Sequence, residues 1–192
     1  ATEDERFFNH SGIDARGTTR AVVFLGGNGG ASTITQQLAK LFFTNKSRSF
    51  VKRVWQKLQE WVIAVQFEKR YTKEEIISMY LNKSEFKYNS FGIGAAARTY
   101  FGKDQSKLAV EEAAVLIGLL KGPSFYDPIR HPERSLRRRN IVLGQMVKND
   151  FLSENDSDVL KAMPIGLSSF KLEVHYDGMA PYFRTTLTST LK

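Results

Sequence analysis

Apolar residues along this chain recur mainly with the period of an α-helix. The longest such pattern covers residues 50–70, where a basic face lies opposite an apolar one. The apolar positions of that face are Phe50, Val54, Leu58, Trp61 and Val65. Similar patterns predict helices around residues 110–120 and 133–147, and a short helix that starts at Ser153 and ends before Pro164. The chain is therefore predicted to be mainly α.

Capping signatures predict where other helices begin. Thr72 precedes Glu75 by three residues, a spacing that lets the hydroxyl and the carboxylate bond reciprocally to backbone N–H groups. The same spacing occurs at Thr2–Glu5 and at Thr33–Gln36. Pro132 suits the first turn of a helix because its ring fixes a helical φ angle.

Three stretches depart from the helical pattern. Residues 82–94 are polar, aromatic and glycine-bearing, which predicts a connection. Apolar residues spaced from 167 to 174 predict the one strand, and they are Leu167, Phe170, Leu172 and Val174. From Pro181 onward the sequence is typical of a linker, so we expect one domain at 1–178 and the start of a linker at 179–192.

Composition narrows the classes of function. The 192 residues include no cysteine, which excludes disulfides, thiol catalysis and cysteine-based zinc sites. The net charge of +8 favours an anionic partner such as a nucleic acid, a phosphorylated substrate or an acidic membrane surface. No apolar run approaches the about 20 residues that span a bilayer. Because the sequence opens on a charged segment, we expect any membrane anchor to lie upstream of Ala1.

Acidic and aromatic residues near the start form a first candidate site. Glu3 and Asp4 lie close in sequence to Phe7 and His10, and a carboxylate in such surroundings can act as a general base. Acidic residues also favour the first turn of a helix because they meet the positive end of its dipole. Spacing alone leaves both interpretations open.

A glycine-rich stretch at residues 26–30 leads into a second candidate site. Backbone N–H groups at a helix start can bind phosphate, but the spacing of a nucleotide-binding P-loop is absent. A nucleoside triphosphate site is therefore excluded. Gln36, Gln37 and Lys40 share one helix face, which is equally compatible with a solvated surface.

Two basic runs complete the candidates. The first run, residues 46–57, contains no acidic residue, and the next acid along the chain is Glu60. This run could bind a diphosphate or form a solvated face. The aromatic residues among positions 42–55 also allow the interpretation that the segment binds a membrane surface. The second run could bind nucleic acid or lipid headgroups, or be an exposed face; it comprises Arg130, Arg134, Arg137, Arg138 and Arg139. No nucleic-acid-binding signature accompanies it.

Taken together, these segments resemble the peptidoglycan glycosyltransferase domain (glycosyltransferase family 51) of class A, bifunctional penicillin-binding proteins. The ordered motifs that carry the resemblance are residues 3–12 (EDERFFNHSG), 30–40 (GASTITQQLAK), 57–60 (KLQE), 92–103 (GIGAAARTYFGK) and 112–140, which ends in RRN. The third motif departs from the family pattern of Arg-Lys-x-x-Glu, because Gln56 stands where arginine is expected. Alignment from Arg48 forward selects Gln56 for the glutamate position, whereas alignment from Tyr71 backward selects Glu60. We choose Glu60 because only it carries a charge, and Arg53 can replace the missing arginine.

The resemblance implies a processive polymerase that joins lipid-linked disaccharide-pentapeptide units (lipid II) into β-1,4 glycan strands, with inversion and release of undecaprenyl diphosphate. It assigns Glu3 as the base that takes the proton of the acceptor's 4-hydroxyl, and Glu60 as a group that orients the donor diphosphate. The residues that it implies for substrate binding are Asp4, His10, Ser32, Thr33, Gln36, Gln37, Lys40, Arg48, Arg53, Lys57 and Asn82. No obligatory cofactor and no protein metal site are implied, and Mg²⁺ or Mn²⁺ is an optional ion at the diphosphate.

The resemblance also implies a lysozyme-like helical lobe with a smaller, membrane-facing (jaw) lobe. The expected partners are lipid II, the growing lipid-linked glycan, the membrane surface and a transpeptidase domain beyond the linker, with no nucleic acid. The expected location is the periplasmic, outer face of the bacterial cytoplasmic membrane, with an upstream transmembrane anchor. Two alternatives stay open: a lytic glycosidase that acts on finished peptidoglycan, and a non-enzymatic module that binds membrane or nucleic acid.

Overall fold

The structure, a computed structural model, describes residues 2–14, 32–43 and 49–172. Its helical elements are η1 (Phe7–Asn9), α2 (Ile34–Phe43), α3 (Phe50–Arg70), α4 (Lys73–Lys83), α5 (Ile93–Phe101), η2 (Gln105–Lys107), α6 (Val110–Leu120), α7 (Pro132–Lys148) and α8 (Glu154–Ala162). Within these ranges there is no strand, and the β-type pairing is an isolated bridge between Glu85 and Phe91. The prediction of a mainly α fold is confirmed.

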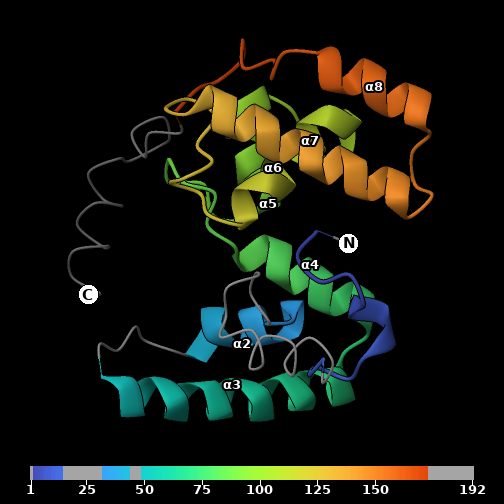
Figure 1. The fold of residues 1–192 in the computed structure, drawn as a ribbon. Coiled ribbons are helices and arrows are strands. Elements are labelled where there is room, and N and C mark those ends of the chain that lie inside the picture. Colours follow the sequence, from blue (N-terminus) through green and yellow to red (C-terminus); the bar gives the residue numbers. More distant parts are fainter. Residues whose placement is uncertain (1, 15–31, 44–48, 173–192) are drawn as a thin grey trace, which may run out of the picture.

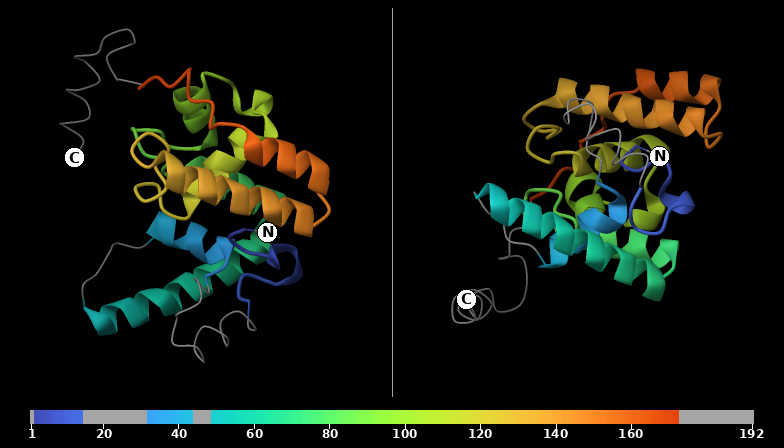
Figure 2. Two further views of the ribbon diagram at one scale, coloured as in Figure 1. Left: turned by 45° about the horizontal axis from the view of Figure 1, so that its top comes forward. Right: turned by 60° about the horizontal axis from the view of Figure 1, so that its bottom comes forward.

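The helices form two groups, which Figure 1 shows one above the other. The long helix α3 packs along α2, and α2 packs on α4; on the other side α6 packs on α7, and α7 on α8. Turning the molecule shows the same division (Figure 2). Helix α4 lies between the groups and contacts α2, α3 and α5.

Each group has its own core. The α2–α4 group is built on buried Phe7, Leu38, Ile76 and Tyr80. The core under α5 and α6 consists of Phe86, Ala96, Ala97, Tyr100, Phe101, Val115, Leu116 and Leu119. Leu120, at the end of α6, packs against both cores and so joins the two groups. The site described below lies where these groups meet.

The strongest periodic patterns and caps predicted these helices well. Helices α3, α6, α7 and α8 coincide with the predicted segments, and Pro132 is in the first turn of α7. Thr72 caps α4 as expected: its backbone N–H donates to Glu75 Oε2 at 2.7 Å, and the Glu75 N–H donates to Thr72 Oγ1 at 3.2 Å. Local sequence therefore determines where these helices begin.

The helix start predicted at Thr2–Glu5 is wrong. The first described turn is the short 3-10 turn η1, and the residue before it makes no side-chain cap bond. The reason is that the neighbouring carboxylates bond elsewhere: Glu3 pairs with Arg138, and Asp4 bonds to His10 and to the start of α2. Long-range contacts replace the local cap.

Helix α5 was not predicted. The segment has only nine residues, with Arg98 exposed and residues 96, 97 and 99–101 buried, so it is too short to give a clear helical pattern in sequence. Two glycines with positive φ define its ends, Gly92 (85°) before it and Gly102 (64°) after it. At Gly92 a side chain is excluded on space as well, because its Cβ would come within 2.8 Å of the Asn82 carbonyl oxygen.

The strand predicted at 167–174 is also wrong over residues 167–172, and Val174 lies outside the described residues. This segment is irregular. Phe170 packs against the core of α5 and α6, and the Lys171 N–H donates to the Thr99 carbonyl at 2.9 Å. Leu167 and Phe170 are spaced to cover that core, whereas Leu172 is exposed.

Asp127, fully buried before α7, secures a strained turn. Lys87, Tyr88 and Asn89 all have positive φ, between 50° and 70°. Asp127 Oδ2 accepts bonds from Lys87 Nζ (2.6 Å) and the Tyr88 hydroxyl (2.7 Å), and Oδ1 accepts from the Ile129 N–H (2.9 Å). Burial raises the pKa of Asp127, but these hydrogen bonds outweigh it and the pKa is lowered overall. The carboxylate therefore stabilises the turn in its charged form.

Candidate active-site cleft

A cleft of about 840 Å³ lies where the two helix groups meet. It contains most of the residues that the sequence singled out: Glu3, Ser32, Gln36, Gln37, Lys40, Arg53, Lys57 and Glu60. These come from the N-terminal segment, from α2 and the residues just before it, and from α3. Residues up to 57 positions apart in sequence thus share one opening, with carboxylates and cations together.

Lys57 and Glu60 form the best-defined contact on the α3 wall. Lys57 Nζ lies 2.8 Å from Glu60 Oε2 and 2.8 Å from Ser32 Oγ, and it donates to both. Glu60 is buried, with 6% of its surface exposed, whereas Lys57 is half-buried. Gln56 lines the same cleft, so the two candidates for the glutamate position, one helical turn apart, both reach it. The carboxylate of Glu60 orients the ammonium group of Lys57.

Glu3 is anchored from the other helix group. Arg138 of α7 donates from Nη2 to Glu3 Oε1 at 2.6 Å, and both side chains are about nine-tenths buried. Tyr80 of α4 lines the same cleft as Glu3. Burial raises the pKa of Tyr80 to about 12, and the negative charge of Glu3 adds to this effect. The Tyr80 hydroxyl donates to Gln37 Oε1 at 2.9 Å, so it stays protonated and fixes the amide of Gln37.

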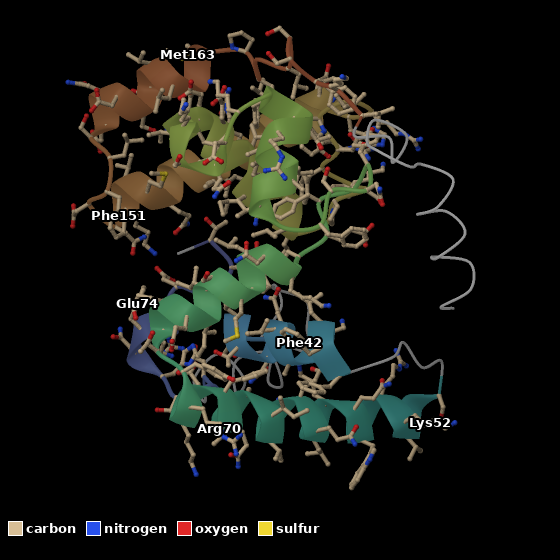
Figure 3. All side chains as sticks on the ribbon, turned by 180° about the vertical axis from the view of Figure 1, so that it is seen from behind. Phe42, Lys52, Arg70, Glu74, Phe151 and Met163 are labelled. Carbon is tan, nitrogen blue, oxygen red and sulfur yellow. The ribbon has the colours of Figure 1, made fainter. Side chains whose placement is uncertain are left out.

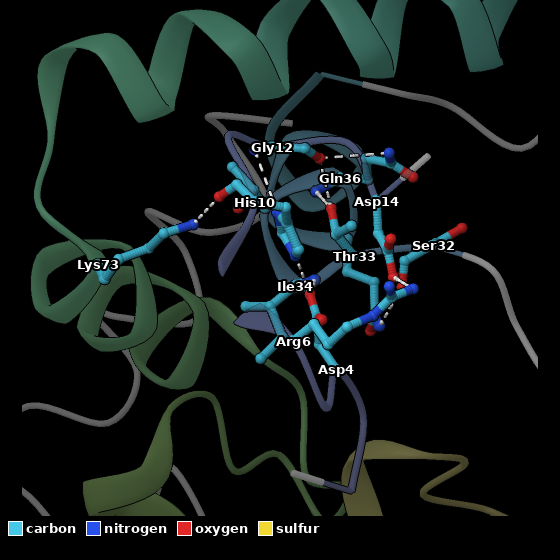
Figure 4. Close-up of polar contacts among 12 residues, drawn as sticks. Asp4, Arg6, His10, Gly12, Asp14, Ser32, Thr33, Ile34, Gln36 and Lys73 are labelled. Atoms are coloured by element: carbon cyan, nitrogen blue, oxygen red, sulfur yellow. Dashed lines mark hydrogen bonds and ion pairs between the residues drawn. The ribbon is translucent and has the colours of Figure 1, made fainter. Parts of the chain in front are cut away.

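Asp4 and His10 face one another, as Figure 4 shows. Neither residue is part of the cleft lining. His10 Nε2 lies 2.9 Å from Asp4 Oδ2, and the N–H of Ile34, at the start of α2, donates to the same oxygen at 3.1 Å. Because His10 Nδ1 accepts the Gly12 N–H at 3.2 Å, a neutral His10 carries its proton on Nε2 and donates it to Asp4. This pair joins the N-terminal segment to the start of α2.

Thr33 belongs to the same junction. Its hydroxyl donates to the Gly12 carbonyl at 2.7 Å and accepts the Gln36 N–H at 3.2 Å, so it caps α2 as predicted. The side-chain amide of Gln36 does not complete a capping box with Thr33. It donates instead to the Gly12 carbonyl at 3.3 Å (Figure 4). Gly12 has φ of 88°, and a Cβ there would lie 3.0 Å from the backbone of Ala64 in α3. The junction therefore requires glycine at this position.

Of the remaining predicted substrate residues, Asn82 does not line the cleft. Asn82 is exposed on α4, where its amide bonds to Ser78 Oγ at 3.5 Å. Arg48 lies outside the described residues. Sequence reasoning assigned no role to several lining residues, although three of them lie within the fifth motif and Leu41 directly follows the second. These residues are Leu41, Tyr80, Ser84, Glu85, Leu120, Lys121 and Pro123. Lys121 adds a further cation, and its signal was its place next to the Gly122-Pro123 segment of the fifth motif.

Comparison with known protein families identifies the family of the chain that forms this cleft. A family model described as Transglycosylase matches residues 1–147. The chain belongs to the transglycosylase family. The expected family is thereby confirmed, and with it the enzyme class of a peptidoglycan glycosyltransferase.

Relatives of this transglycosylase are named as penicillin-binding proteins. The chain is 42% identical over 169 residues to penicillin-binding protein 1A of Haemophilus influenzae, covering 86% of this chain and 19% of the relative. It is 39% identical over 186 residues to penicillin-binding protein 1A of Escherichia coli (95% and 21%), and 37% identical over 196 residues to penicillin-binding protein 1F of Bacillus subtilis (100% and 26%). The chain thus spans about a fifth to a quarter of these relatives' length.

A solved structure shows the same fold. The crystal structure of penicillin-binding protein 1A from Haemophilus influenzae matches 82% of this chain and 20% of its own, with a TM-score of 0.51 and 28% sequence identity. Neither helix group in the described ranges contains a helix long and apolar enough to cross a membrane.

The arginine run of this transglycosylase is only partly an exposed face. Arg130, Arg134 and Arg137 are exposed, but Arg138 and Arg139 are buried, so the interpretation of a continuous basic surface is wrong for these two. Arg139 donates to the carbonyls of Lys161 (2.9 Å) and Met163 (2.8 Å) at the end of α8. Carbonyls at a helix end need such donors, so Arg139 is structural.

Proposed function

We propose that the chain polymerises lipid II into β-1,4 glycan strands and releases undecaprenyl diphosphate. In this reaction the acceptor's 4-hydroxyl oxygen bonds to the donor's anomeric carbon. The bond from that carbon to the diphosphate oxygen breaks, and the electron pair leaves with the diphosphate. One displacement converts an α-linked donor into a β-linked product. The observation that carries the proposal is that Glu3 shares one cleft with Lys40 and Lys57.

Glu3 acts as the general base. Arg138 holds Oε1, while no described residue bonds to Oε2, so one oxygen is anchored and the other can take a proton. The proton of the acceptor hydroxyl passes to this carboxylate as the new glycosidic bond forms. The lining position of Glu3 supports this role, because the acceptor can reach it from the cleft.

The cations of the cleft neutralise the departing diphosphate. Lys40, Arg53, Lys57 and Lys121 line the cleft, and fixed positive charge is most useful where negative charge develops. Lys57 is held ready by Ser32 and Glu60, each 2.8 Å from its ammonium group. Glu60 therefore acts on the diphosphate indirectly, by orienting the ammonium group of Lys57. By the family resemblance Arg48 joins these cations.

A divalent ion is an optional addition at this point. No group of three or more metal-ligating acidic or histidine side chains occurs in the described parts of the chain. Mg²⁺ is often bound by only one or two carboxylates together with substrate phosphates, and Glu60 is placed to be such a ligand. The ion would supply further positive charge at the diphosphate, which the lysine and arginine side chains already provide.

Within the α2–α4 group, helices α2 and α3 form the part that meets the membrane surface. It exposes large apolar side chains, among them Phe43 (61%), Val51 (75%) and Trp55 (63%). Figure 3 shows side chains projecting outward along α3 from Lys52 to Arg70, on the opposite side of the molecule from Met163. Apolar and aromatic side chains interspersed with lysine and arginine favour the lipid interface. A lipid-linked substrate would then enter from the outer face of the cytoplasmic membrane, where an upstream anchor also holds the protein.

A transpeptidase domain is the expected neighbour in the full-length protein. This is supported by the names of the relatives and by the small share of their length that the chain covers. The predicted linker at 179–192 lies outside the described residues. Nucleic acid is not an expected partner, since the buried arginines leave the second basic run discontinuous.

Incubation with two substrates tests the proposed function. We expect the wild-type chain to lengthen glycan from lipid II and to leave finished peptidoglycan intact. Glu3→Gln should fold normally and polymerise at least about 100-fold more slowly, the scale for loss of a positioned base. The matched control is Glu5→Gln, at an exposed carboxylate paired with Lys148. Release of soluble fragments from finished peptidoglycan would instead favour a lytic glycosidase, and salt-sensitive DNA binding without turnover would favour a binding module.

A further inference from the structure

The family resemblance assigns no role to Arg138, although this residue contacts the proposed base directly. Its Nη2 donates to Glu3 Oε1 at 2.6 Å, across 135 positions of sequence. The contact ties the N-terminal segment to α7, and Figure 1 shows the N-terminal end between α4 and α7. A substitution of Arg138 therefore alters the contact that holds the Glu3 carboxylate.

Packing holds the arginine rigidly. On α6, Gly118 leaves just enough room for it, since a Cβ there would lie 3.0 Å from Arg138 Cγ. Its guanidinium carbon lies 5.6 Å from the centre of the Tyr126 ring. With 8% of its surface exposed, Arg138 has little freedom to choose another partner. Glu3 is thus anchored to a fixed point and not to a mobile surface side chain.

Stability alone does not account for this arginine. Its Nε is buried and has no hydrogen-bond partner in the described part of the chain, which is costly for a charged group. A buried ion pair is often no more stabilising than apolar side chains of similar volume. An apolar residue would fill the space beside Gly118 and Tyr126 without an unpaired donor. The gain from arginine therefore lies in what it does to the carboxylate.

We infer that Arg138 is a positioning residue for Glu3, an inference that rests on the proposed function. By holding Oε1, Arg138 fixes the side chain so that Oε2 is left for the acceptor hydroxyl. Arg138 acts through Glu3 and does not touch the reacting atoms.

Three variants separate this role from a structural one: Arg138→Met, Arg138→Lys, and Arg137→Met as control. Arg137 is an exposed neighbour on the same helix, so its variant also removes one charge from α7. Arg138→Met should lower kcat about 10- to 100-fold, the scale for a misplaced catalytic group, while KM for lipid II changes less than about threefold. Arg138→Lys restores a positive charge and should recover part of the loss. Arg137→Met should match the wild type.

A double-mutant comparison gives an independent readout. In a Glu3→Gln background, adding Arg138→Met should slow the residual rate by less than about threefold, because a residue that acts through Glu3 has nothing left to position.

The outcomes are distinct. A folded Arg138→Met with wild-type kcat overturns the inference, as does a change confined to KM. If Arg138→Met lowers the rate by the same factor in the wild-type and Glu3→Gln backgrounds, its role is purely structural. If thermal unfolding shows that Arg138→Met does not fold, Arg138→Lys carries the same comparisons of kcat, KM and background. A wild-type chain that makes no glycan from lipid II would refute the proposed function itself, which the Arg138 variants alone cannot do.

Discussion

Replacing Asp4 by alanine tests whether this residue binds substrate or builds the fold. The family resemblance assigns Asp4 to the substrate, but its side chain is only 5% exposed and lies outside the cleft lining. Its Oδ2 accepts the N–H of Ile34 at 3.1 Å and faces His10 Nε2 at 2.9 Å. Alanine removes both bonds and leaves both donors without this partner.

The expected loss of stability follows from these two bonds. A hydrogen bond to a charged group contributes about 1.5–3 kcal/mol, so loss of the His10 contact alone is substantial. Replacing the acceptor at a helix N-terminus by alanine costs about 0.5–2 kcal/mol, and the loss of a negative charge there removes a favourable interaction with the dipole. Together these effects predict that Asp4→Ala lowers the free energy of unfolding by about 2–5 kcal/mol.

Urea unfolding followed by circular dichroism measures this loss, with a lower midpoint and an unchanged m-value as the expected result. The matched control is Asp158→Ala, whose carboxylate on α8 is 80% exposed and should be replaceable without a measurable change. Glycan synthesis is measured in parallel at a temperature where both variants are folded. If Asp4→Ala keeps wild-type stability but loses glycan synthesis, the structural interpretation of Asp4 is refuted.

Three further predictions concern other parts of the chain. Folding lowers the pKa of Asp127, so its carboxylate stabilises the fold above the unfolded value of about 3.9 and loses this effect as pH falls through the folded value. Asp127→Asn should therefore destabilise the chain at pH 7, with a difference from wild type that shrinks below about pH 4; a difference that stays constant down to pH 2 would contradict this. Replacing Phe43, Val51 and Trp55 together by serine should weaken binding to anionic vesicles at least about 100-fold in a flotation assay, because each such side chain gains up to about 1.5–3 kcal/mol on leaving water. The control is Phe151→Ser, an exposed residue far from Lys52 in Figure 3, and equal effects of the two changes would refute a specific membrane face. Polymerisation should persist within about threefold after EDTA treatment, since the cleft carries its own cations; a loss of more than about tenfold that Mg²⁺ restores would show that the ion is required.

Much of the fold could be predicted because it is encoded locally. The amphipathic pattern of α3 and the Thr72 cap of α4 depend on residues only three or four positions apart. Helix α5 could not be found this way, since it has only nine residues and no side-chain cap at its start. The Thr2–Glu5 signature failed for the opposite reason: its acidic residues bond to α2 and α7, which no local pattern indicates.

The candidate site was only partly accessible from sequence. The basic run at 46–57 was also compatible with a solvated face, and the acids near the start with the first turn of a helix. The family resemblance alone placed them in one site. The structure adds three pairings that neither the sequence patterns nor the family resemblance indicated. Glu3 pairs with Arg138, Glu60 with Lys57, and Asp4 with His10. Such pairings depend on tertiary packing, and charge alone could not distinguish buried Arg138 from its exposed neighbour Arg137.

The most direct test is a crystal structure of the chain bound to a non-reactive lipid diphosphate analogue. The account predicts the diphosphate within hydrogen-bond distance of Lys57 and at least one of Lys40, Arg53 and Lys121, with the sugar between them and the Glu3 carboxylate. Such a structure would also show whether Gln56 or Glu60 approaches the diphosphate. A diphosphate seated elsewhere, with Glu3 out of reach of the sugar, would contradict the central claim.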